Sequence, residues 1–541
     1  MKTPIGFPDC PALRRRLPAA TACAVLIACA GARAAGAQLT DVTQTPNPLN
    51  AGIQKSLEEE IGAGRGDQLT PGSSIYLIGR DPFRAIARGR QLFQRKFTRA
   101  QGNGPRRDDG IGNIAAVGAL GAGLADSCAA CHSRPFGSAG FGGNVFTRPD
   151  SRDAPHLFGL GLVEILADEI TQDLRALRDQ ALRAARSQGS AVALPLVGKG
   201  LSFGALTVYP DGTQDASQVR GVDADLRVRP FFAEGRTLSI REFVVGAFDA
   251  EMGLQAFDPD LLAAAQGQDV VTPAGMVLSG SRDRIEAPPA RAAWEDPDGD
   301  GVVDEVPASL VDFTEFYLLN YFEPGLGRQT SRSRNGYRVF GQIGCAECHV
   351  PSLEIERDRR VAAVHTAYDE AASNRVFNSL FARAELKHDS VDDDTGLPTL
   401  KPPLARGYTV NGIFADFRRH DLGPAFHERD FDGTLRTEFM TEPLWGVAST
   451  PPYGHDGRSA TLTDVILRHG GEARPAREGF AALGEPERAD LLAFLDTLVL
   501  FSPPDTASNL APADPSDPQF PIHGHGSIDL SVLFEQPAEK E

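Results

Sequence analysis

The amino-acid sequence predicts a mainly α-helical protein with two similar domains and loop-rich insertions. Two observations lead to this prediction. The pentapeptide Cys-x-x-Cys-His occurs twice, at 128–132 and at 345–349. Apolar residues also recur at helical spacing, with few Gly or Pro residues, at 158–185 and 240–248. That spacing is the pattern of helices with one buried face.

Each pentapeptide is a sequence to which a c-type haem is attached. Two thiols on one helical turn can form thioethers with the two vinyl groups of a porphyrin, and the adjacent His then reaches the iron as an axial ligand. The alternatives are a redox dithiol or two halves of a zinc site, but neither requires a His after the second Cys. The other three of the seven cysteines, Cys10, Cys23 and Cys29, lie close to the N-terminus.

We therefore expect two covalently bound haem c groups in two cytochrome c-like haem domains. In each domain, two cysteines would hold the porphyrin and one histidine would bind the iron. These residues are Cys128, Cys131, His132, Cys345, Cys348 and His349.

The N-terminus has the pattern of a secretory signal peptide over residues 1–37. Three arginines at 14–16 precede an apolar stretch at 17–30 that is too short to span a membrane, and small residues follow. Because c-type haem is attached outside the cytoplasm in bacteria, we expect a periplasmic protein. The alternative is a lipid anchor at Cys29, since 26–29 also resembles a lipoprotein cleavage site. No other apolar run is long enough to cross a membrane, so we expect no transmembrane segment in the mature chain.

A weak internal repeat places the two haem domains. Gly89-Arg-Gln-Leu-Phe93 is similar to Gly336-Tyr-Arg-Val-Phe340, and we expect each to start the first helix of a cytochrome c unit. The longer stretch between the first copy and its pentapeptide predicts an inserted loop, rich in Gly and Ala, at 99–125.

The far end of the second unit has the pattern of a closing helix that starts at Glu485. Its expected buried residues are Leu491, Leu492, Phe494, Leu495 and Leu498. The predicted organisation is a signal peptide (1–37), an N-terminal extension (38–80), an N-terminal haem domain (81–325), a C-terminal haem domain (326–503) and an extended tail (504–541).

An acidic loop at 296–307 resembles a calcium-binding loop. Carboxylates stand at positions 1, 3, 5 and 9, and a Gly stands at position 6, which is a spacing that surrounds a hard cation with oxygen ligands. The carboxylates are Asp296, Asp298, Asp300 and Asp304. Position 12 is Pro307, so the last Glu of a full EF-hand is missing, and Asp304 or Glu305 would complete the shell. We expect structural calcium here; the alternative is an acidic turn that binds nothing.

The chain is acidic, with 72 Asp and Glu residues against 54 Lys and Arg and a net charge of −18. Removal of the signal peptide takes away more basic than acidic residues. Nucleic acid is therefore not an expected partner. An acidic surface suits a small basic electron donor, such as a cytochrome c or a cupredoxin, although a merely solvated acidic surface would look the same.

Several motifs outside the pentapeptides resemble one bacterial family. They are Pro443-Leu-Trp-Gly446, Pro452-Tyr-Gly-His-Asp-Gly-Arg458, Ala460-Thr-Leu462, His469-Gly-Gly-Glu-Ala473, Phe158-Gly-Leu-Gly-Leu-Val-Glu164, Gly246-Ala-Phe248 with Glu251-Met-Gly253, and His420-Asp-Leu-Gly423. Together they resemble the di-haem oxidoreductase family, peroxidase-like relatives of the di-haem cytochrome c peroxidases.

The resemblance implies a ligand for the second haem. In the di-haem peroxidases the distal ligand follows a Thr-Leu pair by seven residues, and here that position is His469. With His349 it would give a closed, bis-His centre suited to electron transfer. The alternatives are that His469 only ends a helix, and that Met440, His420 or His455 binds the iron instead.

The resemblance also implies that the first haem is the reactive one. The loop that carries a blocking His in relatives matches 145–147, which contains none, so we expect the position opposite His132 to be open; His156 is the alternative ligand. Glu251 stands where the peroxidases place an acid over this haem, and a partly buried carboxylate can transfer protons during peroxide cleavage. Glu164 and Arg236 are weaker candidates for the same pocket, and an exposed helix-end Glu is the alternative reading of Glu251.

One position departs from the family. Relatives often carry a Trp between the haems where this chain has Ala233, next to Phe231 and Phe232. The sequence thus indicates a peroxidase that reduces hydrogen peroxide at the first haem with electrons that enter at the second. A rubber oxygenase-like enzyme that binds dioxygen, and a non-catalytic electron-transfer cytochrome, are the alternatives.

Overall fold

The computed structural model describes residues 56–104, 125–132, 153–368 except 322 and 328, parts of 380–400, 407–429 and 433–500. The contacts separate Met1–Ser56 from Leu57–Glu541. The predicted signal peptide with Cys29, the start of the 38–80 extension, most of the 99–125 loop, the 145–147 stretch and the 504–541 tail lie outside the described residues. Those expectations stay predictions.

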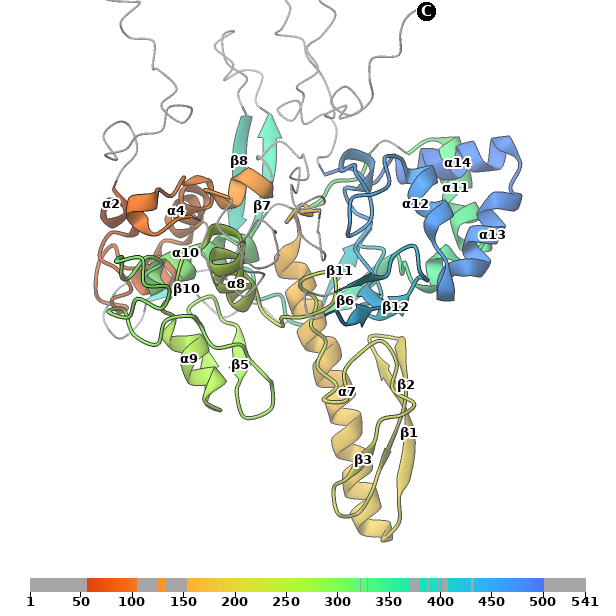
Figure 1. Ribbon diagram of the computed structural model, residues 1–541, viewed down its shortest axis with the longest axis horizontal. Coiled ribbons are helices and arrows are strands. Elements are labelled where there is room, and N and C mark those ends of the chain that lie inside the picture. Colours follow the sequence, from red (N-terminus) through yellow and green to blue (C-terminus); the bar gives the residue numbers. More distant parts are fainter. Residues whose placement is uncertain are drawn as a thin grey trace, which may run out of the picture. The chain divides into compact units, whose positions relative to one another are not determined.

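The first described helices precede the first pentapeptide, and one of them packs on a later helix. They are α2 (Leu57–Ile61), α3 (Ser74–Arg80), α4 (Pro82–Gln94) and the short 3₁₀ helix η1 (Arg99–Gln101). Helix α4 packs against α10 (Ala308–Leu319), as Figure 1 shows. The crossing is close because Gly89 faces the backbone oxygen of Phe313, where a Cβ would overlap.

A long helix follows the first pentapeptide. Helix α7 (Leu160–Gln188) packs against the antiparallel sheet of β1 (Val192–Gly198), β2 (Leu201–Val208) and β3 (Gln214–Asp215). Figure 1 shows the sheet running beside the distal half of the helix. The apolar spacing at 158–185 predicted this helix within three residues at each end.

The chain then returns to α10. Helix α8 (Ile240–Met252) contacts α10, and α9 (Pro259–Ala265) contacts the hairpin of β4 (Asp269–Val271) and β5 (Val277–Ser279). The side chain of Ser239 caps α8 by accepting a hydrogen bond from Glu242 N, as small polar residues at helix starts do. Gly253, with φ +71°, ends α8 immediately after Glu251 and Met252.

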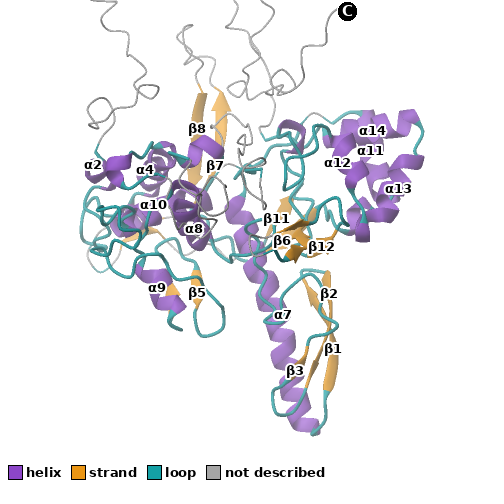
Figure 2. Ribbon diagram, viewed as in Figure 1, coloured by secondary structure: helices purple, strands orange, loops and turns teal. Residues whose placement is uncertain are grey.

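The C-terminal helices form a second group. They are α11 (Ser331–Gln342), η2 (Cys345–Glu347), η3 (Val447–Ser449), α12 (Leu462–Arg468), η4 (Gly471–Ala473), α13 (Arg474–Ala482) and α14 (Glu485–Leu495). Helices α11 and α14 cross in contact (Figure 2). Gly336 lies at this crossing against the backbone oxygen of Asp490 and repeats the role of Gly89.

Short antiparallel strands connect these helices. Strand β6 (Ser352–Ile355) pairs with β11 (Tyr408–Asn411), and β7 (Ala362–Tyr368) pairs with β8 (Leu380–Leu386). The other pairs are β9 (Ser390–Asp392) with β10 (Pro398–Leu400), β12 (Arg419–Asp421) with β15 (Glu438–Met440), and β13 (Glu428–Arg429) with β14 (Leu435–Arg436). Helix exceeds strand in the described chain, but "mainly α" is true only in part.

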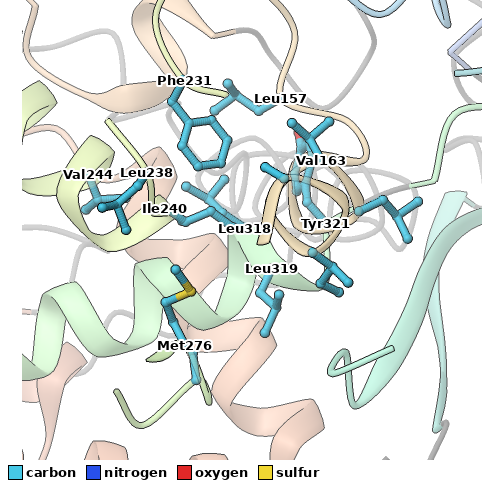
Figure 3. Packing of buried hydrophobic residues seen from close by; sticks show 14 of the residues in the cluster. Leu157, Val163, Phe231, Leu238, Ile240, Val244, Met276, Leu318, Leu319 and Tyr321 are labelled. Carbon is cyan, nitrogen blue, oxygen red and sulfur yellow. The ribbon is translucent and has the colours of Figure 1, made fainter. Parts of the chain in front are cut away.

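Two hydrophobic clusters underlie the two helix groups. The larger is built on α4, α7, α8 and α10, and Figure 3 shows Val163, Ile240 and Leu318 meeting within it. The smaller is built on α11, α13 and α14. Each cluster lies beside one pentapeptide, because Cys128 packs on the first and Cys345 on the second.

The structure corrects two details of the predicted helices. The repeated Gly-to-Phe segments do not start their helices: α4 begins at Pro82 and α11 at Ser331, so each segment lies in the C-terminal half. The closing helix starts at Glu485 as expected, but Leu498 follows it as a buried residue of the next turn. Among the described residues, none of the helices combines the length and apolar character needed to cross a membrane.

Candidate functional site

The first pentapeptide is arranged to bind a metal through His132. Cys128 and Cys131 start and end the single turn of α6 (Cys128–Cys131), and their sulfur atoms are not joined in a disulfide. His132 Nδ1 donates a hydrogen bond to the carbonyl oxygen of Pro155 at 2.8 Å. That bond selects the tautomer whose Nε2 has a lone pair for iron, and burial lowers the pKa of His132, which favours the neutral ring. This donor set fits a c-type haem.

A hollow lies beside this pentapeptide. It encloses an empty volume of about 450 Å³, part of which is open to solvent. Its lining is mostly apolar and comes from α4, α6, α8 and α10, with Phe93, Phe243, Val244, Ala247, Thr314 and Leu318 beside Cys128, Cys131 and His132. A flat apolar ring with one reactive face needs a lining of this kind.

Glu251 lies in the lining of the same hollow as His132. It is on the last turn of α8, and its charge is close enough to oppose the burial that lowers the pKa of His132. Backbone contacts hold this helix end against the pentapeptide: Glu251 O accepts a hydrogen bond from Ala125 N at 3.1 Å. The Asn103 side chain also donates to Ala125 O and Met252 O, each at 2.8 Å.

The two weaker candidates lie elsewhere. Glu164 Oε1 accepts a hydrogen bond from Ile240 N at 2.6 Å, and its other oxygen pairs with Arg359. Arg236 pairs with Glu286 at 2.9 Å near the surface. Neither residue lines the hollow, so the structure does not support a role for them there.

Both ring nitrogens of His156 are engaged by the protein. Nδ1 accepts a hydrogen bond from Phe158 N at 3.2 Å, so Nε2 carries the proton and donates to the carbonyl oxygen of Trp445 at 2.9 Å. A ring in this state has no lone pair for iron. The structure therefore engages His156 elsewhere, while the 145–147 stretch lies outside the described residues, so the open position opposite His132 stays a prediction.

The second pentapeptide holds its histidine in the same way. It forms the 3₁₀ turn η2, and His349 Nδ1 donates to Phe414 O at 3.0 Å. Burial, together with the nearby His469, lowers the pKa of His349 to about 4. Here too Nε2 remains for iron, so this donor set also fits a c-type haem.

His469 is prepared as a ligand by the same kind of bond. It follows α12 as the capping residue, and its Nδ1 donates to Val465 O at 2.7 Å. Burial lowers its pKa. The ring of Phe426 packs edge-on against it, with centroids 5.4 Å apart. His469 therefore ends a helix and keeps the lone pair of Nε2, so its place at the helix end does not exclude a role as a ligand.

The three alternative ligands of the second haem differ in their contacts, and among them only His420 has both ring nitrogens hydrogen-bonded by carboxylates. His420 hydrogen-bonds Asp416 through Nε2 and Glu472 through Nδ1, each at 2.9 Å. His455 stacks on Phe439 with centroids 4.0 Å apart. Met440 packs beside Gly235, since a Cβ on that glycine would lie 3.0 Å from Met440 Sδ.

The pKa of His420 is set by burial and by two neighbours, Asp416 and Cys348. Burial acts to lower the pKa, but the hydrogen bond with Asp416 and the nearby Cys348 thiol raise it to about 11. The Cys348 contribution would be lost once its sulfur forms a thioether. Cys348, Asp416 and His420 also form a group with metal-ligand spacing, but haem attachment would use that same sulfur.

The structure gathers part of the predicted calcium loop. Asp296, Asp298 and Asp300 bring carboxylate oxygens within 4.8 Å of one another. Asp296 accepts hydrogen bonds from Gly299 N and Gly301 N at 2.8 and 3.0 Å, which curls the loop around the group. Asp304, with φ +53°, is not part of this group in the described chain.

Ala233, the position that departs from the family, is hydrogen-bonded to strand β15. Met440 N donates to Ala233 O at 2.7 Å. Phe232 packs on Phe243, with centroids 5.2 Å apart, and Phe243 lies 6.1 Å from His132. The position that holds a Trp in relatives is therefore next to Met440, but its side chain in this chain is a methyl group.

Sequence reasoning did not find α10, which supplies Thr314 and Leu318 to the hollow. Eleven of its twelve residues are buried, so it lacks the one-sided pattern that marks a surface helix. Its acidic residues Asp312 and Glu315 pair with the fully buried Arg241 of α8, which also bonds Asp258. The sequence also did not predict that the carbonyl oxygens of Pro155, Phe414 and Val465 accept hydrogen bonds from the three histidines.

Comparison with known proteins bears on the C-terminal region. Residues 403–498 match the model of a family described as "Di-haem oxidoreductase, putative peroxidase". This match confirms the resemblance drawn from the motifs. It includes His469 and Trp445 but neither pentapeptide and not Glu251. None of the curated proteins matches the sequence.

Two solved structures are similar over part of the chain. A hydrazine synthase of Kuenenia stuttgartiensis pressurised with xenon is 17% identical over 35% of this chain and 55% of its own, with a TM-score of 0.21. This chain thus spans about half of the length of that relative. A MauG-like protein associated with microbial copper homeostasis is 17% identical over 54% of this chain and 76% of its own, with a TM-score of 0.23. Scores this low do not establish a common fold.

Proposed function

We propose, from the match of residues 403–498 to the di-haem oxidoreductase family, that this protein is a periplasmic di-haem c-type cytochrome that reduces peroxide. The observation that carries the proposal is the unequal surroundings of the two pentapeptides. His132 shares a hollow with Glu251, whereas His349 has His469 as its neighbour. One site is open for a small substrate and the other is closed by a second imidazole.

The haem groups, when bound, supply the one-electron redox chemistry that no side chain provides. Reduction of one hydrogen peroxide takes two electrons and two protons and yields two water molecules. The described residues contribute the protons and the geometry. His132 would bind the haem iron beside the hollow, and its hydrogen bond to Pro155 fixes the orientation of its ring.

Glu251 is the residue placed to move protons. In a largely apolar hollow, its carboxylate can take the proton from one peroxide oxygen and return it to the other as that oxygen leaves as water. The apolar lining limits competing water, and the backbone contacts of Ala125, Asn103 and Met252 hold the helix end in place.

His349 and His469 form the proposed entry site for electrons. Two imidazoles whose Nδ1 atoms are fixed by carbonyl oxygens would hold this haem as a rigid pair of ligands, which would lower the reorganisation that accompanies electron transfer. The donor we propose is a small redox protein, either a cytochrome c or a cupredoxin. The net charge of −18 favours a basic one.

A second function is favoured by one observation. The hollow at His132 is lined mostly by apolar side chains, which also suits an apolar substrate and dioxygen, as in the rubber oxygenases. A protein with both irons six-coordinate would instead be an electron-transfer cytochrome without catalysis.

Substitution of Glu251 separates these functions. In Glu251→Gln, we expect peroxide-dependent oxidation of reduced cytochrome c to fall about 10²- to 10⁴-fold, the usual contribution of general acid–base catalysis. Glu286→Gln is the matched control, since Glu286 pairs with Arg236 outside the hollow. Haem content is measured in both variants. Undiminished turnover in Glu251→Gln would reject the assigned role, and oxygen uptake without peroxide would favour the oxygenase.

We also propose that Asp296, Asp298 and Asp300 bind calcium in a structural role, with Asp304 drawn in when the ion binds. Calcium at 100 times its dissociation constant would raise the free energy of unfolding by about 2.7 kcal/mol. The measurement is thermal unfolding with calcium and with a chelator. Asp298→Asn should lose the calcium effect, and the same shift in that variant would contradict the proposal.

Location is the remaining part of the proposal. Cell fractionation should find the protein in the periplasm, cleaved after Ala37. Recovery with membranes, together with a fatty-acylated N-terminus, would indicate the lipid anchor at Cys29 instead.

A further inference from the structure

We propose that His156 couples the two haem sites by completing a hydrogen-bonded relay between their proximal histidines, His132 and His349. The proposal rests on the di-haem function proposed above and names a residue which that function does not use. In this role His156 is a positioning residue and never touches iron.

The relay starts behind His132. His132 Nδ1 donates to Pro155 O at 2.8 Å, and the next residue along the chain is His156. His156 Nδ1 accepts from Phe158 N, which leaves the proton on Nε2. Nε2 then donates to Trp445 O at 2.9 Å. These bonds connect the first pentapeptide with residues 403–498, called here the family-matched region.

The second half returns to His349. Leu444 N, next to Trp445 in the chain, donates to Ile413 O at 3.0 Å. Phe414 follows Ile413, and its carbonyl oxygen accepts the hydrogen bond from His349 Nδ1 at 3.0 Å. Four hydrogen bonds and short covalent segments thus connect the two axial histidines.

Two glycines permit the close approach at the centre of the relay. Gly446 has φ +81°, and a Cβ there would lie 3.0 Å from His156 Nε2. Gly159 has φ +72°, and a Cβ there would lie 2.6 Å from Cζ2 of Trp445. Larger residues at either position would push the two segments apart, so the local sequence is suited to this crossing.

The crossing is fastened at a second point. Asp153 N donates to His455 O at 2.8 Å. The segment that holds His132 is therefore bonded to the family-matched region both before and after Pro155. A movement at one axial histidine is transmitted to the other through bonded backbone.

The relay provides a route for one electron. With both haems bound, one electron would leave the haem that His349 holds and reach the haem that His132 holds, with no bond formed or broken. Hydrogen bonds behind an axial histidine also set its basicity and hence the potential of its iron. A second route runs through Phe243 and Phe232 to Ala233 and Met440, but it lacks the aromatic ring that relatives place at position 233.

Substitutions at His156 test the relay. His156→Phe keeps a ring but removes the donor, while His156→Gln keeps an N–H that can reach Trp445 O. The control is His427→Phe, the same change at a histidine that pairs with Asp421 at 2.7 Å outside the relay. Each variant, with both haems loaded, receives one electron by flash photoreduction, and transfer between the haems is followed by absorbance without peroxide.

We expect transfer to slow about tenfold in His156→Phe, the lower end of the effect of losing a hydrogen bond behind a metal ligand. His156→Gln should recover most of the rate, and His427→Phe should keep the wild-type rate. Equal rates in wild type and His156→Phe, or equal slowing in all three variants, would overturn the relay. If His156→Phe does not load both haems, His156→Met, which fills the space without a donor, replaces it.

The result is separable from the proposed function. Slowed transfer in a protein that shows no peroxide turnover would keep the relay and reject the peroxidase. Peroxide turnover with unchanged transfer in His156→Phe would keep the peroxidase and reject the relay.

Discussion

The two pentapeptides are held alike and face different surroundings. His132 and His349 each donate through Nδ1 to a backbone carbonyl, of Pro155 and Phe414 respectively. His132 and Glu251 line one hollow, whereas His469 is close enough to His349 to lower its pKa. The comparison teaches that a repeated motif, held by the same kind of hydrogen bond, can have different neighbouring residues.

The helices around the two sites also share one packing feature, a glycine at a close helix crossing. Helix α4 crosses α10 at Gly89, and α11 crosses α14 at Gly336. Each glycine removes a Cβ that would overlap a backbone oxygen of the crossing helix. The internal repeat is therefore a repeat of helix crossings, and the difference between the sites comes from the segments added around them.

The largest expected effect is the loss of one haem when the cysteines of one pentapeptide are replaced. Cys128→Ser with Cys131→Ser should remove one haem and the high-spin signal with it. Cys345→Ser with Cys348→Ser should remove the other haem and the low-spin signal. Protein mass and the ferric spectrum check both variants. Loss of the same signal in both would show that the two sites are equivalent.

The next effect concerns the closed site alone. His469→Ala should convert the His349 haem from low spin to high spin and leave the His132 haem unchanged, because one of two strong axial ligands is lost. His420→Gln is the control, since both nitrogens of His420 bond carboxylates. A low-spin signal that persists in His469→Ala would assign the ligand to another residue, with Met440 the next to substitute.

The helix crossings predict a smaller, matched pair of effects. Gly89→Ala and Gly336→Ala should each lower the free energy of unfolding by about 1–3 kcal/mol, as overpacking does. Gly341→Ala is the control, because a Cβ at this position of α11 meets nothing within 4 Å. That change should be neutral or stabilise by about 0.5–1 kcal/mol. Urea unfolding measures all three, and equal behaviour of Gly336 and Gly341 would refute the crossing argument.

The smallest expected effect is a pH dependence of the unfolding free energy that arises from His420. Asp416 and Cys348 together overcome burial and raise the pKa of His420 from 6.5 to about 11. The protonated form is favoured in the folded state, so its contribution to stability is full below pH 6.5 and is lost as pH rises toward 11. The thioether at Cys348 would lower the upper limit. The unfolding free energy of His420→Gln should differ from that of wild type at low pH and converge with it at high pH; a constant difference would contradict this assignment.

Much of the helical fold could be predicted from the sequence. The apolar spacing located α7 and α8, and the start of α14 came from its Glu-Pro-Glu signal. The repeat was found, but its position within the helices was wrong, because Gly89 and Gly336 mark crossings and not helix starts. Helix α10 was missed because it is buried on all sides, and the short strand pairs carry too little alternation to detect.

The candidate site was predictable as far as side chains carry a signal. The motifs brought forward His132, His349, His469 and Glu251, and the structure groups them as two pairs. The backbone carbonyls that orient the imidazoles, and the glycine-permitted contact of His156 with Trp445, depend on tertiary geometry. Nothing in residue identity alone specifies such contacts.

The most direct test of unequal sites is the electron paramagnetic resonance spectrum of the oxidised, fully loaded protein. The open hollow at His132 and the paired imidazoles of His349 and His469 predict one high-spin and one low-spin ferric signal of equal intensity. Two low-spin signals would contradict the account, because both irons would then be closed to peroxide.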